Sequence, residues 1–373
     1  MRHFDTKALL VPLLAVITAM VAGMLLIYGI GYDAMYAYQA LITGAIGSPA
    51  AIGSTILRAA PIILTGLSVM IAFRAGLFNI GGTGQAIMGL LCAGVVAIYM
   101  DFLPGPTHWI VALLAAIIGG GLWGALAGYL KVARGANEVV VTIMLNYVAI
   151  RIGEYLLGLG GPLQEKGSSI PASAAFPDEA KLPVFWRPNP FTEVHMGVVV
   201  ALLAAGVVWF LITRTSIGYQ IRAVGLQPEA AEYGGMSVTK VTVVGMFVAG
   251  ALAGLGGAVA TLGELERMQK SELAVTQIGF AGIAVALLGR NTAIGCVFAG
   301  LLMGALDSGA VGIQNQNALP SGVASKLIGV IQGLIVLFIG MDLLFRRYSD
   351  KIHGWFEREQ PPEAPAPLTG ASG

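Results

Sequence analysis

The chain has 373 residues, of which 56% are hydrophobic and 11% charged, with a formal net charge of +1 and a mean hydropathy of +0.80. Soluble domains carry about 25% charged residues, so this composition excludes an ordinary water-soluble domain. The small net charge offers no basic surface for nucleic acid. The sequence therefore predicts an integral membrane protein that does not bind nucleic acid.

Several apolar segments approach the roughly 20 residues that a helix needs to cross the hydrocarbon core. They are residues 8–30, 55–73, 84–100, 109–130, 138–157, 194–213, 241–262, 275–289, 292–311 and 323–343. We expect residues 1–345 to form an all-α polytopic membrane domain, a bundle of about ten transmembrane helices surrounded by lipid. Residues 346–373 form a cytoplasmic tail whose Pro- and Ala-rich end is typical of disorder.

Lys and Arg in short loops set the orientation of a membrane protein, because positively charged flanks stay in the cytoplasm. The connections 31–54, 101–108 and 312–322 contain neither residue. We expect these connections outside and both termini in the cytoplasm. The segment 158–193 holds six prolines and is predicted to be an ordered outer loop.

Glycine accounts for 52 residues and lies within the apolar segments. Many of these glycines are four residues apart, as in Gly120–Gly124–Gly128, Gly250–Gly254, Gly300–Gly304 and Gly329–Gly333. Small residues at this spacing let membrane helices approach closely. Tight helix packing explains most of the glycine, and Cys92 and Cys296 are expected to be small packing residues.

The segment FRAGLFNIGGTGQAIMG, residues 73–89, places Asn79 and Gln85 in a glycine-rich stretch between two apolar segments. Irregular backbone at membrane depth is tolerated where it lines a cavity or is buried by protein. We propose a discontinuous helix beside a transport path. The alternative is a tight cytoplasmic turn that binds nothing.

Glu138, Thr142 and Asn146 are spaced four apart and lie on one face of a predicted apolar helix. This face points to the interior of the bundle, because a carboxylate in lipid is costly. It either lines the translocation path or forms hydrogen bonds between helices. Arg151 and Glu154 are expected to form a local ion pair.

Asp307 is a carboxylate within a predicted span, and Lys326 lies at the matching depth of the next span. A structural pair between Asp307 and Lys326 is the leading interpretation, with proton coupling through Asp307 as the alternative.

The loop 214–240 is predicted to be cytoplasmic and to contain a short helix. Pro228 suits a first helical position, Glu229 the first turn, and Gly234 and Gly235 a helix terminator. Such a helix is available to dock on a cytoplasmic partner.

Catalytic and nucleotide-binding motifs are missing. The sequence contains no G-x-x-x-x-G-K-[ST], no H-E-x-x-H and no G-x-S-x-G. We expect neither an enzyme, nor a cofactor, nor a metal site.

Four motifs occur in order: FNIGGTGQ (78–85), NEVVVTIMLNY (137–147), AVGLQPEAAEYGGM (223–236) and GFAGIAVALLGRNTAIG (279–295). Together they resemble the permeases of binding-protein-dependent ABC importers for simple sugars and nucleosides, and the nucleoside-type permeases in particular. The resemblance implies a type II importer fold in the bacterial plasma (inner) membrane. It also implies three kinds of partner: a second homologous permease, a cytoplasmic ATPase and an extracytoplasmic substrate-binding protein. Thr83 departs from the family, where this position is often acidic.

The resemblance places the coupling helix in the cytoplasmic loop, at Gly225, Pro228, Glu229, Ala230, Ala231, Gly234 and Gly235. We expect ATP-driven import of a neutral solute, a nucleoside or else a simple sugar, past Asn79, Gln85, Thr142 and Asn146. A secondary transporter driven by an ion gradient is the rival, but titratable groups near the middle of the spans are sparse.

Overall fold

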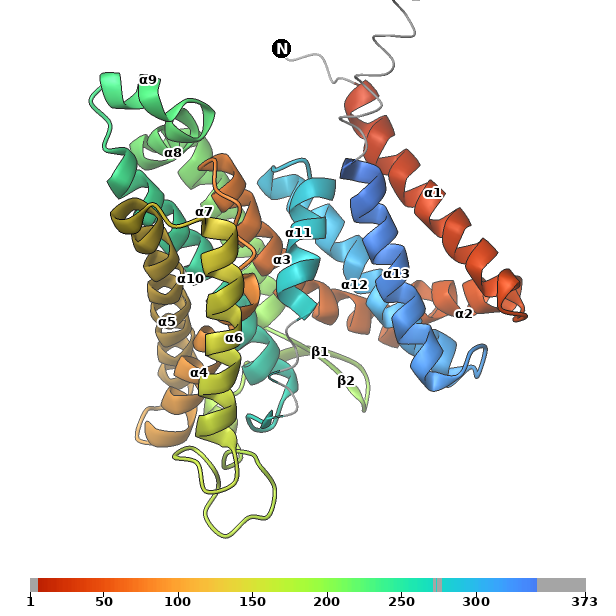
Figure 1. The fold of residues 1–373 in the computed structure, drawn as a ribbon. Coiled ribbons are helices and arrows are strands. Elements are labelled where there is room, and N and C mark those ends of the chain that lie inside the picture. Colours follow the sequence, from red (N-terminus) through yellow and green to blue (C-terminus); the bar gives the residue numbers. More distant parts are fainter. Residues whose placement is uncertain (1–5, 271–272, 274–276, 341–373) are drawn as a thin grey trace, which may run out of the picture.

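The computed structural model describes residues 6–270, 273 and 277–340, which form a bundle of helices with one β-hairpin (Figure 1). The α-helices are α1 (Thr6–Gly29), α2 (Ala34–Ile46), α3 (Pro49–Arg74), α4 (Gly82–Tyr99), α5 (Gly105–Arg134), α6 (Glu138–Leu157), α7 (Gly197–Arg214), α8 (Ser216–Leu226), α9 (Pro228–Tyr233), α10 (Val238–Glu264), α11 (Gln277–Leu288), α12 (Ala293–Asn315) and α13 (Ser321–Gly340). The hairpin pairs β1 (Val184–Asn189) with β2 (Thr192–His195). The tail 346–373 and the end of the membrane domain, 341–345, lie outside the described residues.

Within the described ranges, nine helices are long and apolar enough to cross a membrane. They correspond in order to the predicted spans, except that the eighth predicted span, 275–289, contains the shorter helix α11 of 12 residues. The structure thus confirms the prediction of a polytopic helical bundle and makes the protein a multi-pass membrane protein.

The segment 31–54 is not the simple connection that we predicted, because it contains α2 and the first turn of α3. The side chain of Asp33 accepts a hydrogen bond from the backbone N–H of Tyr36 at 3.0 Å and caps α2. Ser48 caps α3 in the same way, and Pro49 occupies its first turn. Side-chain oxygens at these positions satisfy the free N–H groups of a helix start.

The loop 158–193 leads into a β-hairpin that we did not predict. Val184 pairs with His195 across the two strands, so the seventh helix begins at Gly197 and not at 194. The loop is fixed to the connection after α10, since the backbone N–H of Phe176 donates to the carbonyl of Glu266 at 2.8 Å. We call the end of the bundle that carries the hairpin and this loop the hairpin end, and the opposite end the α8–α9 end.

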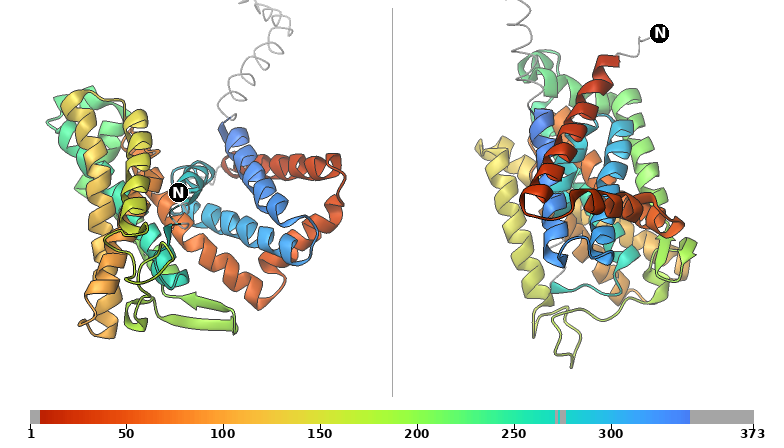
Figure 2. Two further views of the ribbon diagram at one scale, coloured as in Figure 1. Left: turned by 60° about the horizontal axis from the view of Figure 1, so that its bottom comes forward. Right: turned by 90° about the vertical axis from the view of Figure 1, so that its right-hand side faces the viewer.

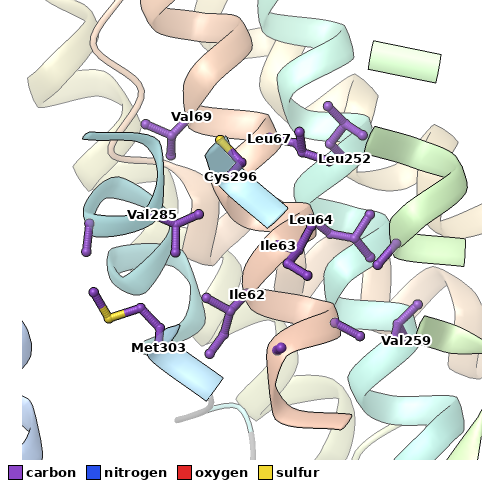
Figure 3. Packing of buried hydrophobic residues seen from close by; sticks show 14 of the residues in the cluster. Ile62, Ile63, Leu64, Leu67, Val69, Leu252, Val259, Val285, Cys296 and Met303 are labelled. Carbon is purple, nitrogen blue, oxygen red and sulfur yellow. The ribbon is translucent and has the colours of Figure 1, made fainter. Parts of the chain in front are cut away.

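Helix α3 runs through the centre of the bundle, where Leu64 and Leu67 are fully buried. Figure 3 shows side chains from three other helices around it: Leu252 and Val259 of α10, Val285 of α11, and Cys296 and Met303 of α12. Burying large apolar side chains on all faces of one helix is typical of the centre of a membrane bundle.

Close glycine packing is confirmed between α5 and α10. A Cβ atom on Gly120 would lie 2.5 Å from the carbonyl oxygen of Gly250, and one on Gly254 would lie 2.5 Å from that of Ala116. On α13, however, a Cβ atom on Gly329 or Gly333 would meet nothing within 4 Å. The packing prediction for this last pair is therefore wrong within the described part of the chain.

Candidate translocation and coupling sites

Two of the predicted path residues form a reciprocal amide pair in the connection between α3 and α4. The Asn79 amide donates to Gln85 Oε1 at 3.0 Å, and the Gln85 amide donates back to Asn79 Oδ1 at 3.1 Å. The same Asn79 oxygen accepts the backbone N–H of Gly81 at 2.9 Å. Both side chains are 1% exposed, so the pair fixes the irregular segment 75–81 from inside the protein.

Asn146 of α6 joins this network from another helix. Its Oδ1 accepts the backbone N–H of Gly84 at 2.7 Å, and its amide donates to the carbonyl of Ile80 at 2.9 Å. Space is tight at this contact, because a Cβ atom on Gly84 would lie 2.9 Å from Asn146 Oδ1. The amide thus satisfies one of the N–H groups that the start of α4 leaves free and one carbonyl of the segment before it.

The other two residues of the predicted polar face, Thr142 and Glu138, bond to α6 itself and to α5. Thr142 is fully buried and its hydroxyl donates to the carbonyl of Glu138 at 2.7 Å. Glu138 itself forms an ion pair with Lys131 of α5 at 3.0 Å. The structure thus links Asn79, Gln85 and Asn146 through the segment 79–85, and Thr142 lies beside them, since a Cβ atom on Gly81 would be 3.0 Å from its Cβ. Their place beside a solute path stays a prediction.

The segment 75–81 touches the loop between α7 and α10. Gly76 has a φ of +71°, and a Cβ atom there would lie 3.0 Å from Gly225 Cα of α8. Just before it, the Arg74 guanidinium donates twice to the carbonyl of Asn291, at 2.9 and 2.7 Å, in the turn between α11 and α12. One short stretch of chain therefore contacts both α8 and the turn at 289–292.

The predicted short helix in the loop 214–240 is confirmed as α9, which starts at Pro228 and ends before Gly234. Gly235 follows with a φ of +80°, a conformation that glycine adopts freely. Helices α8 and α9 stand at one end of the bundle (Figure 1). Leu226 is 87% and Tyr233 94% exposed there, so this tip presents apolar side chains that nothing in the described chain covers.

The predicted pair between Asp307 and Lys326 does not form. Asp307 Oδ1 instead accepts the amide of Gln332 at 2.8 Å, and no ion pair joins Asp307 to Lys326 within 4.0 Å among the described residues. Lys326 is exposed. The predicted local pair between Arg151 and Glu154 is present.

Two charged residues that we did not predict as site residues line cavities at the hairpin end. Arg58 lies within α3 and borders two cavities of about 370 and 430 Å³, and Glu264, the last residue of α10, borders the first. An arginine inside the apolar segment 55–73 was a visible signal, because ionisable residues within spans are rare and face a cavity or the bundle interior.

These features define a class: a multi-pass membrane protein with an exposed helical tip at one end. The model of the family described as "Branched-chain amino acid transport system / permease component" matches residues 51–340, and the chain belongs to this family.

Three similar proteins, each matching this chain over nearly its full length, are named as permeases. Guanosine ABC transporter permease protein NupP of Bacillus subtilis is 39% identical over 92% of this chain and 96% of its own. Nucleoside ABC transporter permease protein NupB of Lactococcus lactis is 33% identical over 91% and 92%. Glucose ABC transporter permease protein TsgB13 of Haloferax volcanii is 32% identical over 96% and 93%. The chain is a permease component of a multi-subunit ABC transport system.

Proposed function

We propose that this chain is the permease subunit of an ATP-driven importer that moves nucleosides across the bacterial plasma membrane. The observation that carries the proposal is the 39% identity, over 92% of the chain, to a protein named as a guanosine permease. A simple sugar is the second candidate, because a protein named as a glucose permease is 32% identical over 96% of the chain.

ATP hydrolysis belongs to a separate subunit in this proposal, and the tip formed by α8 and α9 is its docking site. Exposed Leu226 and Tyr233 offer an apolar contact of the kind that a protein partner covers. The contact of Gly225 with Gly76 connects the tip to the bundle. The residues that we assign to coupling are Gly225, Pro228, Glu229, Ala230, Ala231, Gly234 and Gly235.

A second permease subunit and an extracytoplasmic binding protein complete the proposed complex. The free glycine face of α13 suits close approach of another helix, and we assign it to the second permease. The hairpin end is assigned to the outside and the α8–α9 end, with both termini, to the cytoplasm. Arg74, Arg214 and Arg222 at the α8–α9 end follow the positive-inside rule.

Reconstitution tests the substrate and the energy source together. The permease is co-expressed with its ATPase, second permease and binding protein, and the complex is placed in proteoliposomes. We expect uptake of labelled inosine or uridine that requires the binding protein outside and ATP at the α8–α9 side. Uptake of glucose or ribose alone would transfer the assignment to a sugar. Uptake driven by an ion gradient without ATP would contradict both.

A further inference from the structure

Two adjoining cavities at the hairpin end are lined by polar and charged side chains. They measure about 370 and 430 Å³ and share Ser54, Arg58, Phe191 and Thr192 in their walls. Each falls in the range of roughly 300–1,000 Å³ that small-molecule sites occupy. A cavity of about 80 Å³ deeper in the bundle is too small by the same measure. We call the two joined cavities the hairpin vestibule. Figure 2 (left), with the hairpin end turned forward, shows the hairpin beside α3.

Arg58 lies nine residues after the start of α3, which places it about 14 Å along a helix that rises 1.5 Å per residue. The side chain is exposed to the vestibule. Within residues 6–270, 273 and 277–340, its guanidinium makes no hydrogen bond and no ion pair shorter than 4.0 Å. Ionisable residues within spans are rare and face a water-filled cavity or the bundle interior. Five free N–H donors there are available to a ligand.

The charges around Arg58 decide what kind of ligand fits. Glu264 lines the same cavity and lies within electrostatic range of Arg58, yet beyond ion-pair distance. Glu193 is engaged by Arg187 at 3.0 Å, and Asp307 by Gln332. The Arg58 guanidinium thus faces the Glu264 carboxyl group, and neither has an ion-pair partner among the described residues. The vestibule therefore lacks the net positive charge that would attract an anion. It suits a neutral solute that carries both acceptors and donors.

An aromatic ring completes the set. Phe191 sits in the turn between β1 and β2, is 94% exposed and lines both cavities. An exposed aromatic face stacks on a nucleobase, which is worth about 1–3 kcal/mol per base. An arginine fork fits adjacent acceptors on a base edge, and a carboxylate accepts an N–H or O–H.

We propose that the hairpin vestibule is the permease's own binding site for a neutral nucleoside. Arg58 donates to oxygen or nitrogen acceptors of the base or ribose, Glu264 accepts a hydrogen bond from an N–H or hydroxyl, and Phe191 stacks on the base. The site stands at the end of the bundle assigned to the outside, where the binding protein releases its load. This inference rests on the proposed nucleoside function and adds the residues that recognise the solute.

Cysteine labelling tests the occupant directly. Ser54→Cys is introduced into the assembled complex after Cys92 and Cys296 are replaced by alanine, in a background that retains uptake. A membrane-impermeant thiol reagent is added outside, without binding protein. We expect labelling that excess inosine slows several-fold, while glucose has no effect. Lys166→Cys, on the exposed outer loop and outside the vestibule, is labelled at one rate throughout.

Two results would overturn the site. Labelling of Ser54→Cys that inosine leaves unchanged means that no nucleoside binds there. The second result is that inosine has no effect, while labelling is slower in phosphatidylglycerol vesicles than in phosphatidylcholine vesicles. This result would assign Arg58 to a lipid headgroup instead.

Transport separates this inference from the proposed function. We expect Arg58→Gln and Glu264→Gln to lower inosine uptake about tenfold at saturating binding protein, a change of 1.4 kcal/mol in solute binding. In both variants, the stimulation of ATPase activity by the binding protein should stay near the wild-type value. The control Lys181→Gln, on the outer loop, should transport normally.

If the wild type transports inosine and both variants do so equally well, the proposed site is wrong and the proposed function stands. If the wild type transports no nucleoside, the proposed function fails. Where either variant fails to assemble, the labelling result decides.

Discussion

Asn146 is a single side chain that joins α6 to the start of α4 and to the connection between α3 and α4. It satisfies the backbone of Gly84 and Ile80 with both ends of its amide. Replacement by alanine removes the partner of the buried Gly84 N–H, which costs about 1–3 kcal/mol, and that of the part-buried Ile80 carbonyl. We expect Asn146→Ala to lower the melting temperature of the purified permease and to impair uptake without preventing assembly. Val148→Ala, at an exposed site on the same helix, is the control. Equal melting temperatures for the two variants would contradict the role of the amide.

His195 gives the hairpin a dependence on pH. Its ring is 1% exposed, its Nδ1 accepts the backbone N–H of Gly197 at 3.1 Å, and burial lowers its pKa from 6.5 to about 4. Below pH 6.5 His195 binds a proton in the unfolded chain, whereas in the folded chain it stays neutral down to about pH 4. Stability is therefore lost as pH falls through this window, by up to about 3 kcal/mol. The melting temperature of the wild type should fall relative to that of His195→Gln as the pH is lowered from 6.5 to 4, and a constant difference across that range would refute the effect.

Residue-level inference from the sequence worked where spacing alone decides the neighbours. Glu138, Thr142 and Asn146 share a helical face because they are four apart, and the structure buries Thr142 and Asn146. The pairing of Asp307 with Lys326 rested on depth, which says nothing about how a helix is rotated. Six residues along α13 from Lys326, Gln332 points about 120° away around the helix and reaches Asp307. Only packing fixes that rotation.

At the scale of elements, α8 meets the segment 75–81 in a close backbone contact at Gly225, and our proposal has this contact transmit movement to the bundle. A Cβ atom on Gly225 would lie 2.8 Å from the backbone nitrogen of Gly76 and closer still to the carbonyl of Arg74. Gly225→Val therefore forces α8 away from the segment 75–81. We expect the complex to keep hydrolysing ATP while nucleoside uptake per ATP falls at least about tenfold, a loss of about 1.4 kcal/mol of coupling. Gly206→Val, where a Cβ atom meets nothing within 4 Å, should change neither rate. A normal ratio in Gly225→Val would place the coupling contact elsewhere.

Element prediction followed the strength of the local signal. Helix α9 was readable because Pro228 and Gly234 mark both of its ends. Helix α2 was missed because its 13 residues are too few to cross a membrane, the length on which the search for spans relied. The hairpin was missed because Pro188 lies within β1, and proline argues against a strand except at an edge. Both elements are held by tertiary contacts, which the sequence does not display.

At the scale of the whole molecule, the exposed helix faces differ in kind. On α5 and α7 they carry large apolar side chains such as Ile118, Leu122, Leu203 and Phe210, which suit lipid. On α13 the exposed positions include Gly322, Gly329, Gly333 and Gly340, where an added Cβ atom meets nothing within 4 Å. Figure 2 (right) shows α13 near the surface beside α1. A glycine face offers lipid no side chains to pack against, whereas it allows a second helix to approach closely.

This contrast provides a matched test of the second permease. Gly333→Phe and Gly206→Phe both place a large ring in open space, so neither disturbs the chain's own packing. We expect Gly333→Phe to reduce co-purification of the second permease, because the ring holds the two helices apart and removes the contacts that associate them in lipid. Gly206→Phe, on the lipid-facing side of α7, should co-purify at the wild-type level. If both variants retain the partner, the interface lies on another face, and the exposed side of α6, which carries the ion-paired Arg151, is the next to test, since a charge is costly against lipid.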